Sequence, residues 1–90
     1  MKKIERKYVI GKEPINFNKL IEKDLINYTK DANAIYTGMA FELHSNGKKS
    51  VEVPLKHGKY HGIAKVWDEN GKLTNEITWK NGEYISEIMY

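Results

Sequence analysis

The sequence predicts a mainly β protein, built as a single antiparallel meander of hairpin repeats with a 24-residue period. Three observations lead to this prediction. A stretch of 24 residues recurs without a gap, apolar and polar residues alternate within it, and glycine-containing turns separate the alternating runs. Residues 1–35 lack the repeat, and we expect them to cover one face or edge of the sheet.

The two copies of the repeat are residues 36–59 and 60–83. A further copy begins at Tyr84, so residues 84–90 are predicted to form a terminal strand. The chain is thus expected to divide into a lead-in segment, 1–35, and a repeat segment, 36–90. The identical positions of the two copies are Tyr36/Tyr60, Gly38/Gly62, Ala40/Ala64, Asn46/Asn70, Gly47/Gly71, Lys48/Lys72, Glu52/Glu76, Lys56/Lys80 and Gly58/Gly82.

Each copy is predicted to contain two strands. Val51, Val53 and Leu55 alternate with other residues in the first copy, and Ile77 and Trp79 do so in the second. Such a period of two, rich in β-branched and aromatic residues, is typical of a strand with one buried face. The turn signals between the strands are Ser45-Asn46-Gly47-Lys48, Lys56-His57-Gly58-Lys59, Glu69-Asn70-Gly71-Lys72 and Lys80-Asn81-Gly82-Glu83.

Strand register decides which turn type keeps the apolar residues on one face. A two-residue loop at Asn46-Gly47 would pair Leu43 with Ser50 and mix apolar with polar side chains. A three-residue loop, a type I turn followed by glycine in the left-handed conformation, pairs His44 with Lys48 instead. We predict this loop at all four turns, with Gly47, Gly58, Gly71 and Gly82 as the left-handed glycines.

This register places odd-numbered residues opposite odd-numbered ones, so that one continuous apolar row crosses five strands. The predicted row consists of Phe41, Val51, Ile63, Ile77 and Ile85. The opposite face is expected to be small or polar and open to solvent. One of its predicted rows consists of Ala40, Glu52, Gly62, Thr78 and Tyr84.

The lead-in segment has two interpretations. We favour strands at 4–10 and 25–29, with a helical turn near 17–23 between them. The alternative is a longer helix, with Asn16 or Asn18 as its N-cap. Its apolar residues at helical spacing would be Phe17, Leu20, Ile21, Leu25 and Tyr28.

Composition restricts the function classes. The absence of cysteine excludes disulfides and thiolate metal sites. No apolar run follows the basic start, and no stretch is long enough to span a membrane, so a cytoplasmic location is expected. Residues 1–35 hold eight Lys or Arg and five Asp or Glu, whereas residues 36–90 hold seven of each. The excess positive charge therefore belongs to the lead-in segment.

Fourteen of the fifteen cations are lysine, and Arg6 is the single arginine. Reading of guanine by two parallel hydrogen bonds is mainly a task of arginine, so the composition argues against a sequence-specific nucleic-acid reader. A weaker hypothesis is salt-sensitive binding of nucleic acid or an anionic membrane by the basic segment. Its cations are Lys2, Lys3, Arg6, Lys7 and Lys12.

The repeat resembles the bacterial variant of MORN repeats. The matching residues are Tyr36-Thr37-Gly38, Asn46-Gly47-Lys48, Glu52, Lys56-His57-Gly58, His61-Gly62, Asn70-Gly71-Lys72, Glu76 and Lys80-Asn81-Gly82. Many proteins of this kind are described as the YwqK-type antitoxin component of a toxin–antitoxin pair. The resemblance covers 36–86 and implies successive hairpins that bind another protein. The chain departs from the fuller pattern at Ala40 and Ala64, where members often have a larger residue.

The sequence contains no arrangement that favours an enzyme, a metal site or a cofactor. Glu52 and Glu76 are one period apart, so they are expected on the same face, where a structural or solvating role is favoured over acid–base catalysis. His57 and His61 are four residues apart, but a turn separates them and no third ligand accompanies them. We therefore predict a non-enzymatic protein without metal or cofactor.

The function predicted from the sequence is that of a protein-binding module, an antitoxin, immunity or phage-type inhibitor that occludes a toxin or effector nuclease. Aromatic residues are frequent anchors of interfaces, and an unpaired edge strand can accept a strand from another chain. An alternative is self-assembly of a homo-oligomer through the edge strand 83–90. The residues predicted to contact the partner are Tyr60, Trp67, Trp79, Tyr84, Ile88 and Tyr90.

Overall fold

The computed structural model describes residues 6–90, in which strands predominate and the one helical element is a 3₁₀ turn. The elements are β1 (Tyr8–Ile10), β2 (Ile15–Asn16), η1 (Phe17–Lys19), β3 (Leu20–Lys23), β4 (Ile26–Thr29), β5 (Ile35–Leu43), β6 (Lys49–Lys56), β7 (Lys59–Tyr60), β8 (Gly62–Trp67), β9 (Leu73–Lys80) and β10 (Glu83–Met89). The predicted mainly β fold of hairpin-like antiparallel strands is confirmed.

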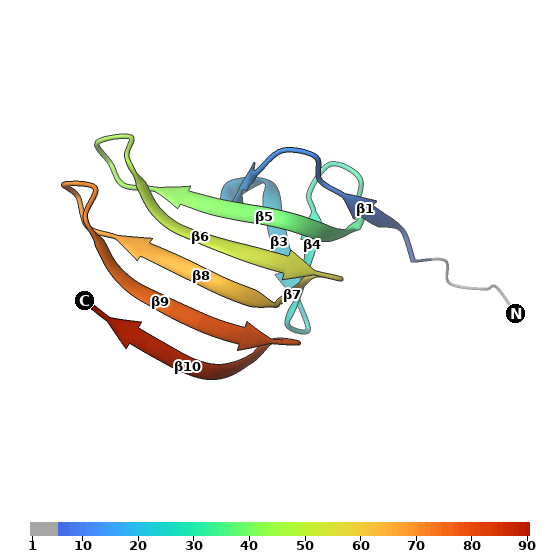
Figure 1. Ribbon diagram of the computed structural model, residues 1–90. Coiled ribbons are helices and arrows are strands. Elements are labelled where there is room, and N and C mark those ends of the chain that lie inside the picture. Colours follow the sequence, from blue (N-terminus) through green and yellow to red (C-terminus); the bar gives the residue numbers. More distant parts are fainter. Residues whose placement is uncertain (1–5) are drawn as a thin grey trace, which may run out of the picture.

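Strands β5, β6, β8, β9 and β10 lie side by side in one curved layer, and each is antiparallel to its neighbour (Figure 1). The short strand β7 continues the ladder on β6. The β3–β4 hairpin joins the start of β5 and lies behind this layer in Figure 1. Two short strands, β1 and β2, pair with β5 in parallel, so the meander has parallel additions that the sequence did not predict.

The layer has an inner face, which contacts the lead-in segment, and an outer face on the opposite side. On the inner face Ala40 pairs with Val53, and Ala64 pairs with Ile77. Leu20 of β3 packs into the same buried cluster, which gives the protein its core. The remaining buried members of that cluster are Tyr36 and Leu55, and the partly buried residues packed against it are Ile15, Phe17, Tyr60, Ile77 and Trp79.

The predicted three-residue loop is confirmed at two of the four turns. The His44 N–H donates to the Lys48 carbonyl at 2.7 Å, and the Asp68 N–H donates to the Lys72 carbonyl at 2.9 Å. The glycine of each loop has a φ of about +85°, which is the left-handed conformation that a residue without Cβ adopts at little cost.

The three-residue loop is wrong at the other two turns, His57-Gly58 and Asn81-Gly82. Both are two-residue loops, because the residues directly flanking each loop pair with each other. The first residue of each loop has a φ of +50°, and the glycines have φ of +78° and +85°. Positive φ at both positions is the type I′ geometry, whose twist matches that of the flanking strands.

The predicted apolar row is also wrong. A register shift occurs next to each three-residue loop, so that farther along the strands even-numbered residues face odd-numbered ones. Phe41 and Ile63 share the outer face, as predicted, but Val51 and Ile77 lie on the inner face. Ile85 falls at a bulge in β10.

The buried face is the one predicted to be small and open to solvent. Its predicted row is split, because Glu52 and Thr78 lie on the outer face. Ala40 has no exposed surface and Ala64 is 3% exposed. The short side chains at these positions leave room for Leu20 to pack close to the sheet, so they mark close approach between layers rather than contact with water.

The lead-in segment follows the favoured interpretation in part. Strand β4 starts one residue later than the predicted strand 25–29, and β1 occupies the end of the predicted strand 4–10. The helical turn is shorter than predicted, with Asn16 as its N-cap, and the longer helix is wrong because residues 20–23 form β3. Residues 4 and 5, and the basic residues Lys2 and Lys3, lie outside the described residues.

Equivalent backbone hydrogen bonds recur 24 residues apart. The Gly58 N–H donates to the Tyr36 carbonyl at 2.8 Å, and the Gly82 N–H donates to the Tyr60 carbonyl at 2.8 Å. Each two-residue turn is therefore tied to the first residue of its own copy of the repeat. The first turn has an additional contact, because the Asn27 backbone and side-chain nitrogens both donate to the Gly58 carbonyl, at 2.9 and 3.0 Å.

Alanine at Gly58 is expected to destabilise the protein more than alanine at Gly47. Both residues have positive φ, which costs an L-residue about 1–2 kcal/mol. A Cβ at Gly58 would also lie 2.5 Å from the Ile26 Cγ2 atom and 3.0 Å from backbone atoms of Asn27, whereas nothing lies within 4 Å at Gly47. Gly58→Ala should therefore lose about 1–3 kcal/mol more than Gly47→Ala in urea unfolding. Equal losses would contradict the close docking of the β3–β4 hairpin.

Candidate functional site

A row of four aromatic rings crosses the inner face, from the buried core to the exposed edge of the sheet. Phe17, Tyr60, Trp79 and Tyr84 contact one another in sequence, edge to face, with centroid distances of 6.4, 5.1 and 5.8 Å. Such pairs stabilise a fold beyond the burial of their surface. The row connects the lead-in segment to the edge strand β10.

The core closes at one end of the sheet and stays open at the other. Tyr36, Tyr60 and Tyr84 occupy the same position of successive copies, and they are 3% exposed, half-buried and 55% exposed, respectively. Within the described residues, no side chain beyond Ala64 is buried. The inner face of β9 and β10 is therefore an unfinished interior, with aromatic and aliphatic side chains but no covering layer.

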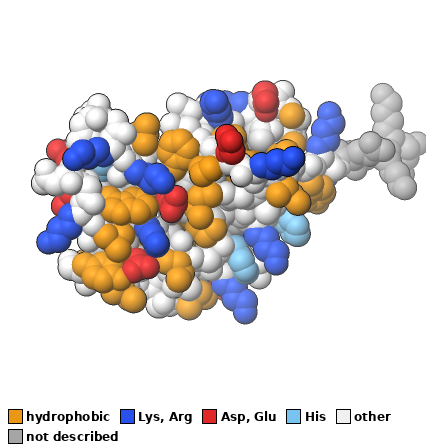
Figure 2. Space-filling model, turned by 45° about the horizontal axis from the view of Figure 1, so that its top comes forward, with side chains coloured by type: hydrophobic (Ala, Val, Ile, Leu, Met, Phe, Trp, Pro, Cys, Tyr) orange, Lys and Arg blue, Asp and Glu red, His pale blue; other side chains and the backbone are white. Residues whose placement is uncertain are grey.

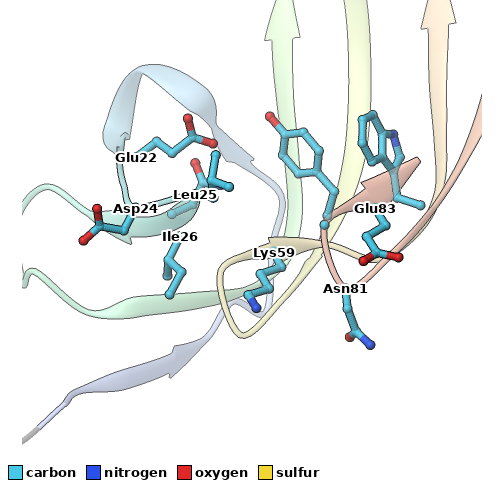
Figure 3. A pocket seen from close by; sticks show the side chains of 11 residues that line it. Glu22, Asp24, Leu25, Ile26, Lys59, Asn81 and Glu83 are labelled. Atoms are coloured by element: carbon cyan, nitrogen blue, oxygen red, sulfur yellow. The ribbon is translucent and has the colours of Figure 1, made fainter. Parts of the chain in front are cut away.

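A groove lies where this open face meets the tip of the β3–β4 hairpin. Its cavity volume is about 510 Å³. Figure 3 shows side chains of the hairpin on one side of the groove and Lys59, Asn81 and Glu83 on the other. The full lining is Glu22, Asp24, Leu25, Ile26, Asn27, Lys59, Tyr60, Trp79, Asn81, Gly82 and Glu83. A second hollow of about 260 Å³ shares Tyr60 and Trp79 and extends toward Phe17 and Ile77.

The hairpin tip beside the groove is strained and apolar. Asp24 and Leu25 have φ of +51° and +64°. A γ-branched residue in this conformation is uncommon, because its Cβ crowds the backbone. The Leu25 side chain is also 78% exposed. Positive φ at both positions closes the β3–β4 hairpin as a two-residue turn, but the exposed Leu25 side chain does not stabilise the isolated chain. Non-glycine residues in this conformation are frequent at binding sites.

Charge is distributed unequally between the two faces of the main layer. On strands β5 to β10, the strand pairing places the acidic residues Glu42 and Glu87 on the inner face. Lys49 follows a register shift, and its ammonium reaches Glu52 and Trp67 on the outer face. Lys65 lies on the outer face in one row with Glu52 and Glu76. The inner face is thus acidic although the chain has a net charge of +3.

The acidic surroundings act on the tyrosines of the aromatic row. Burial raises the pKa of the Tyr60 hydroxyl above its ordinary value, and the negative charges of Glu22 and Glu42 raise it further. The Tyr84 hydroxyl donates to the Glu87 carboxylate at 3.0 Å, and this hydrogen bond raises the pKa of Tyr84. Both rings therefore stay neutral at physiological pH.

Strand β10 is an edge strand, as predicted for residues 83–90. The Tyr90 N–H donates to the Thr74 carbonyl at 2.9 Å, so Tyr90, Ile88 and Ser86 direct their backbone groups toward β9. Because hydrogen-bonding direction alternates along an antiparallel strand, Glu87 and Met89 direct their N–H and C=O groups to the free edge. These groups can form a ladder with another strand.

The structure divides the residues predicted to contact a partner between the two faces. Tyr60, Trp79 and Tyr84 lie together on the inner face. Trp67 lies on the outer face, where the Lys49 ammonium is 5.7 Å from its ring centroid. Ile88 pairs with Glu76 on the outer face, and the hydroxyl of Tyr90 donates to the Glu76 carboxylate. Apolar side chains on the side shown in Figure 2 are interspersed with charged ones.

The glutamates and histidines considered as catalytic or metal-binding candidates make contacts within the fold. Glu52 and Glu76 share the outer face, as predicted, with Lys65 between them, and Glu52 forms an ion pair with Lys49 at 3.0 Å. The His57 ring packs edge-on against Tyr8, and the His61 Nδ1 atom accepts the Asn81 N–H at 3.1 Å. Among residues 6–90, no three His, Cys, Asp or Glu side chains are placed to hold a metal ion.

Sequence reasoning missed the acidic rim of the groove. Glu22 and Asp24 lie in the lead-in segment, and only the folding of the β3–β4 hairpin onto the His57-Gly58 turn brings them near Trp79. One available signal was the alternation Ile26-Asn27-Tyr28-Thr29 after the apolar pair Leu20-Ile21 and the polar residues 22–24, which is compatible with a hairpin. The two sides of the groove are far apart in the sequence, so no local pattern indicated that Glu22 and Asp24 would lie near Trp79.

Comparisons with protein-family models, with curated proteins and with solved structures find no match for this chain. The resemblance to MORN repeats accordingly rests on the repeat residues alone and stays a prediction. In the described part of the chain, no helix has the length and apolar character needed to cross a membrane.

The titration of Tyr60 tests the geometry of the groove. Because the folded protein holds the Tyr60 proton more tightly than the unfolded chain does, the associated stability is complete below the ordinary pKa of about 10 and is lost as pH rises through the higher folded value. A ¹³C NMR titration of the Tyr60 Cζ signal should give a midpoint above 10. Glu22→Gln should lower that midpoint, whereas Glu69→Gln, in the distant 68–72 loop, should not. A Glu22→Gln midpoint equal to that of the wild type would contradict the placement of the hairpin tip.

Proposed function

We propose that the chain is a non-enzymatic protein-binding module that uses the open end of its inner face and the free edge of β10. One observation carries this proposal: the interior ends at Ala64, while the aromatic row continues to an edge strand that is exposed along its whole length. A partner strand added to β10 would extend the sheet and cover the unfinished interior.

The apolar surface of β10 supports binding rather than solvation. Monomeric proteins limit long apolar edge strands, because such edges pair with other chains. This strand has only two charged residues, Glu83 and Glu87, and no proline. Its exposed apolar and aromatic residues are Tyr84, Ile85, Ile88 and Met89, and the next residue, Tyr90, is also exposed.

The narrower function within this proposal is that of an antitoxin or immunity-type inhibitor, bacterial or phage-encoded, acting in the cytoplasm on a toxin or effector nuclease. The MORN-like pattern of the repeat supports it. A neighbouring gene product co-expressed with the chain should then co-elute with it in size-exclusion chromatography. Separate elution of the two proteins would remove that narrower function and leave the binding module itself in place.

Proline at Met89 should separate strand addition from side-chain contact. The Met89 N–H points to the free edge, so Met89→Pro removes an outward donor without removing a hydrogen bond to β9. Met89→Ala shortens the same side chain and keeps the donor. We expect immobilised Met89→Pro to retain about tenfold less partner than Met89→Ala. Urea unfolding of both variants checks that the fold is intact.

Two results would count against the binding proposal. The first is that the wild-type chain retains no protein, either from an extract of its source cells or from co-expression with neighbouring gene products. The second is that Met89→Pro and Met89→Ala retain the same amount, which would show that the free edge takes no part.

Self-assembly is the second candidate function, because the same free edge can pair with the edge of another copy. Sedimentation velocity over a wide concentration range tests it. A self-assembling chain should form dimers at high concentration, and Met89→Pro should shift the monomer–dimer equilibrium toward monomer by about tenfold. A wild-type chain that stays monomeric up to millimolar concentration would exclude this function.

A further inference from the structure

The groove beside Trp79 combines aromatic walls with an acidic rim. Tyr60 and Trp79 contact each other with ring centroids 5.1 Å apart, and both line the cavity. Three acidic residues, Glu22, Asp24 and Glu83, are among its lining residues, whereas Lys59 is the one cation in that lining. Figure 3 shows that these groups come from both sides of the groove.

The rim carboxylates have no partner of their own in the described part of the chain. The ion pair found there joins Lys49 to Glu52 on the outer face. Neither Glu22, Asp24 nor Glu83 forms a side-chain hydrogen bond with residues 6–90, in contrast to Glu87, whose carboxylate accepts from Asn75 at 2.6 Å. Their negative charge is therefore available to a ligand.

We propose that this groove binds the ammonium or guanidinium group of a lysine or arginine side chain, presented by an extended segment of a partner protein. This inference rests on the proposed binding function and names the chemistry of its partner. A cation near the face of an indole or phenol ring is attracted by the ring quadrupole, and the rim carboxylates add electrostatic attraction. The aliphatic stem of the same side chain would pack on Leu25 and Ile26.

Charge complementarity selects a basic partner over an acidic one. Lys59 is the one cation in the lining of the groove, and the Lys49 ammonium reaches Glu52 and Trp67 on the outer face. Glu42 adds negative charge in the second hollow beside Tyr60 and Trp79, and Glu87 adds it on the inner face of β10. A basic segment that pairs with the edge of β10 would meet acidic groups along its inner side. A nucleic-acid phosphate at the same place would be repelled.

An NMR titration with single amino-acid derivatives tests the groove without any partner protein. The ligands are Nα-acetyl-lysine amide and Nα-acetyl-arginine amide, with Nα-acetyl-norleucine amide as the uncharged match to lysine. The chain has two tryptophans, so Trp67 on the outer face serves as an internal control for Trp79. We expect the charged derivatives to shift the Trp79 indole N–H signal, and the Trp67 signal to stay in place.

A matched pair of variants then tests the rim. The double change Glu22→Gln and Glu83→Gln should weaken binding of the lysine derivative by about threefold or more, because two carboxylates lose their charge while their size is kept. The control Glu69→Gln removes a carboxylate in the distant 68–72 loop and should leave the affinity unchanged. Binding should also weaken as salt is raised from about 20 to about 300 mM, because the rim is exposed and the Debye length falls roughly fourfold over this range.

Three results would overturn the inference: an unmoved Trp79 signal, equal shifts from the norleucine derivative, or an unchanged affinity in the double variant. In the double variant, a Trp67 signal at its wild-type position shows that the protein is folded. These results are independent of the Met89 variants, which report on strand addition to a whole partner protein. A failed cation site and a failed binding function are therefore distinguishable.

Discussion

The packing of Leu20 against the inner face, where Ala40 and Ala64 leave room for it, is the contact on which the rest of the structure depends. A curved antiparallel layer with one apolar face cannot be stable in water until another layer covers that face. In this chain the cover is a short hairpin rather than a helix or a second sheet. Its position is held by the pairing of β4 with β5 and by two hydrogen bonds from Asn27 to the Gly58 carbonyl, so the His57-Gly58 turn contributes to the closure of the core.

The cover is shorter than the sheet, and this mismatch generates the candidate site. Three tyrosines at equivalent positions of the repeat show how far the cover extends: Tyr36 is buried, Tyr60 is half-buried and Tyr84 is exposed. The covered end supplies the stability, and the uncovered end presents interior-type side chains to solvent. Strand β10 has few buried contacts, so its local opening should require less free energy than unfolding of the core strands. A partner strand would add the missing contacts.

The two faces of the layer also differ in how their charges are used. On the outer face Glu52, Lys65 and Glu76 follow one another in a cross-strand row, which keeps that face soluble and its charges balanced. On the inner face, the two acidic residues have no basic neighbour on the same strands. Together with the rim of the groove they produce a local field opposite in sign to the net charge of the chain. That contrast supports a basic partner at the open end of the sheet.

The sequence by itself determined the β fold, the positions of all four turns in the repeat segment and the exposed edge strand, because these follow from local alternation and from glycine at positive φ. It did not determine the loop length at His57-Gly58 and Asn81-Gly82, or the register shift beside the other two loops. One residue of register exchanges the faces, so Val51 and Ile77 were assigned to the wrong row relative to Phe41. Only the tertiary structure decided that the alanine face is buried and that Glu22 lies near Trp79, because both depend on where the lead-in hairpin docks.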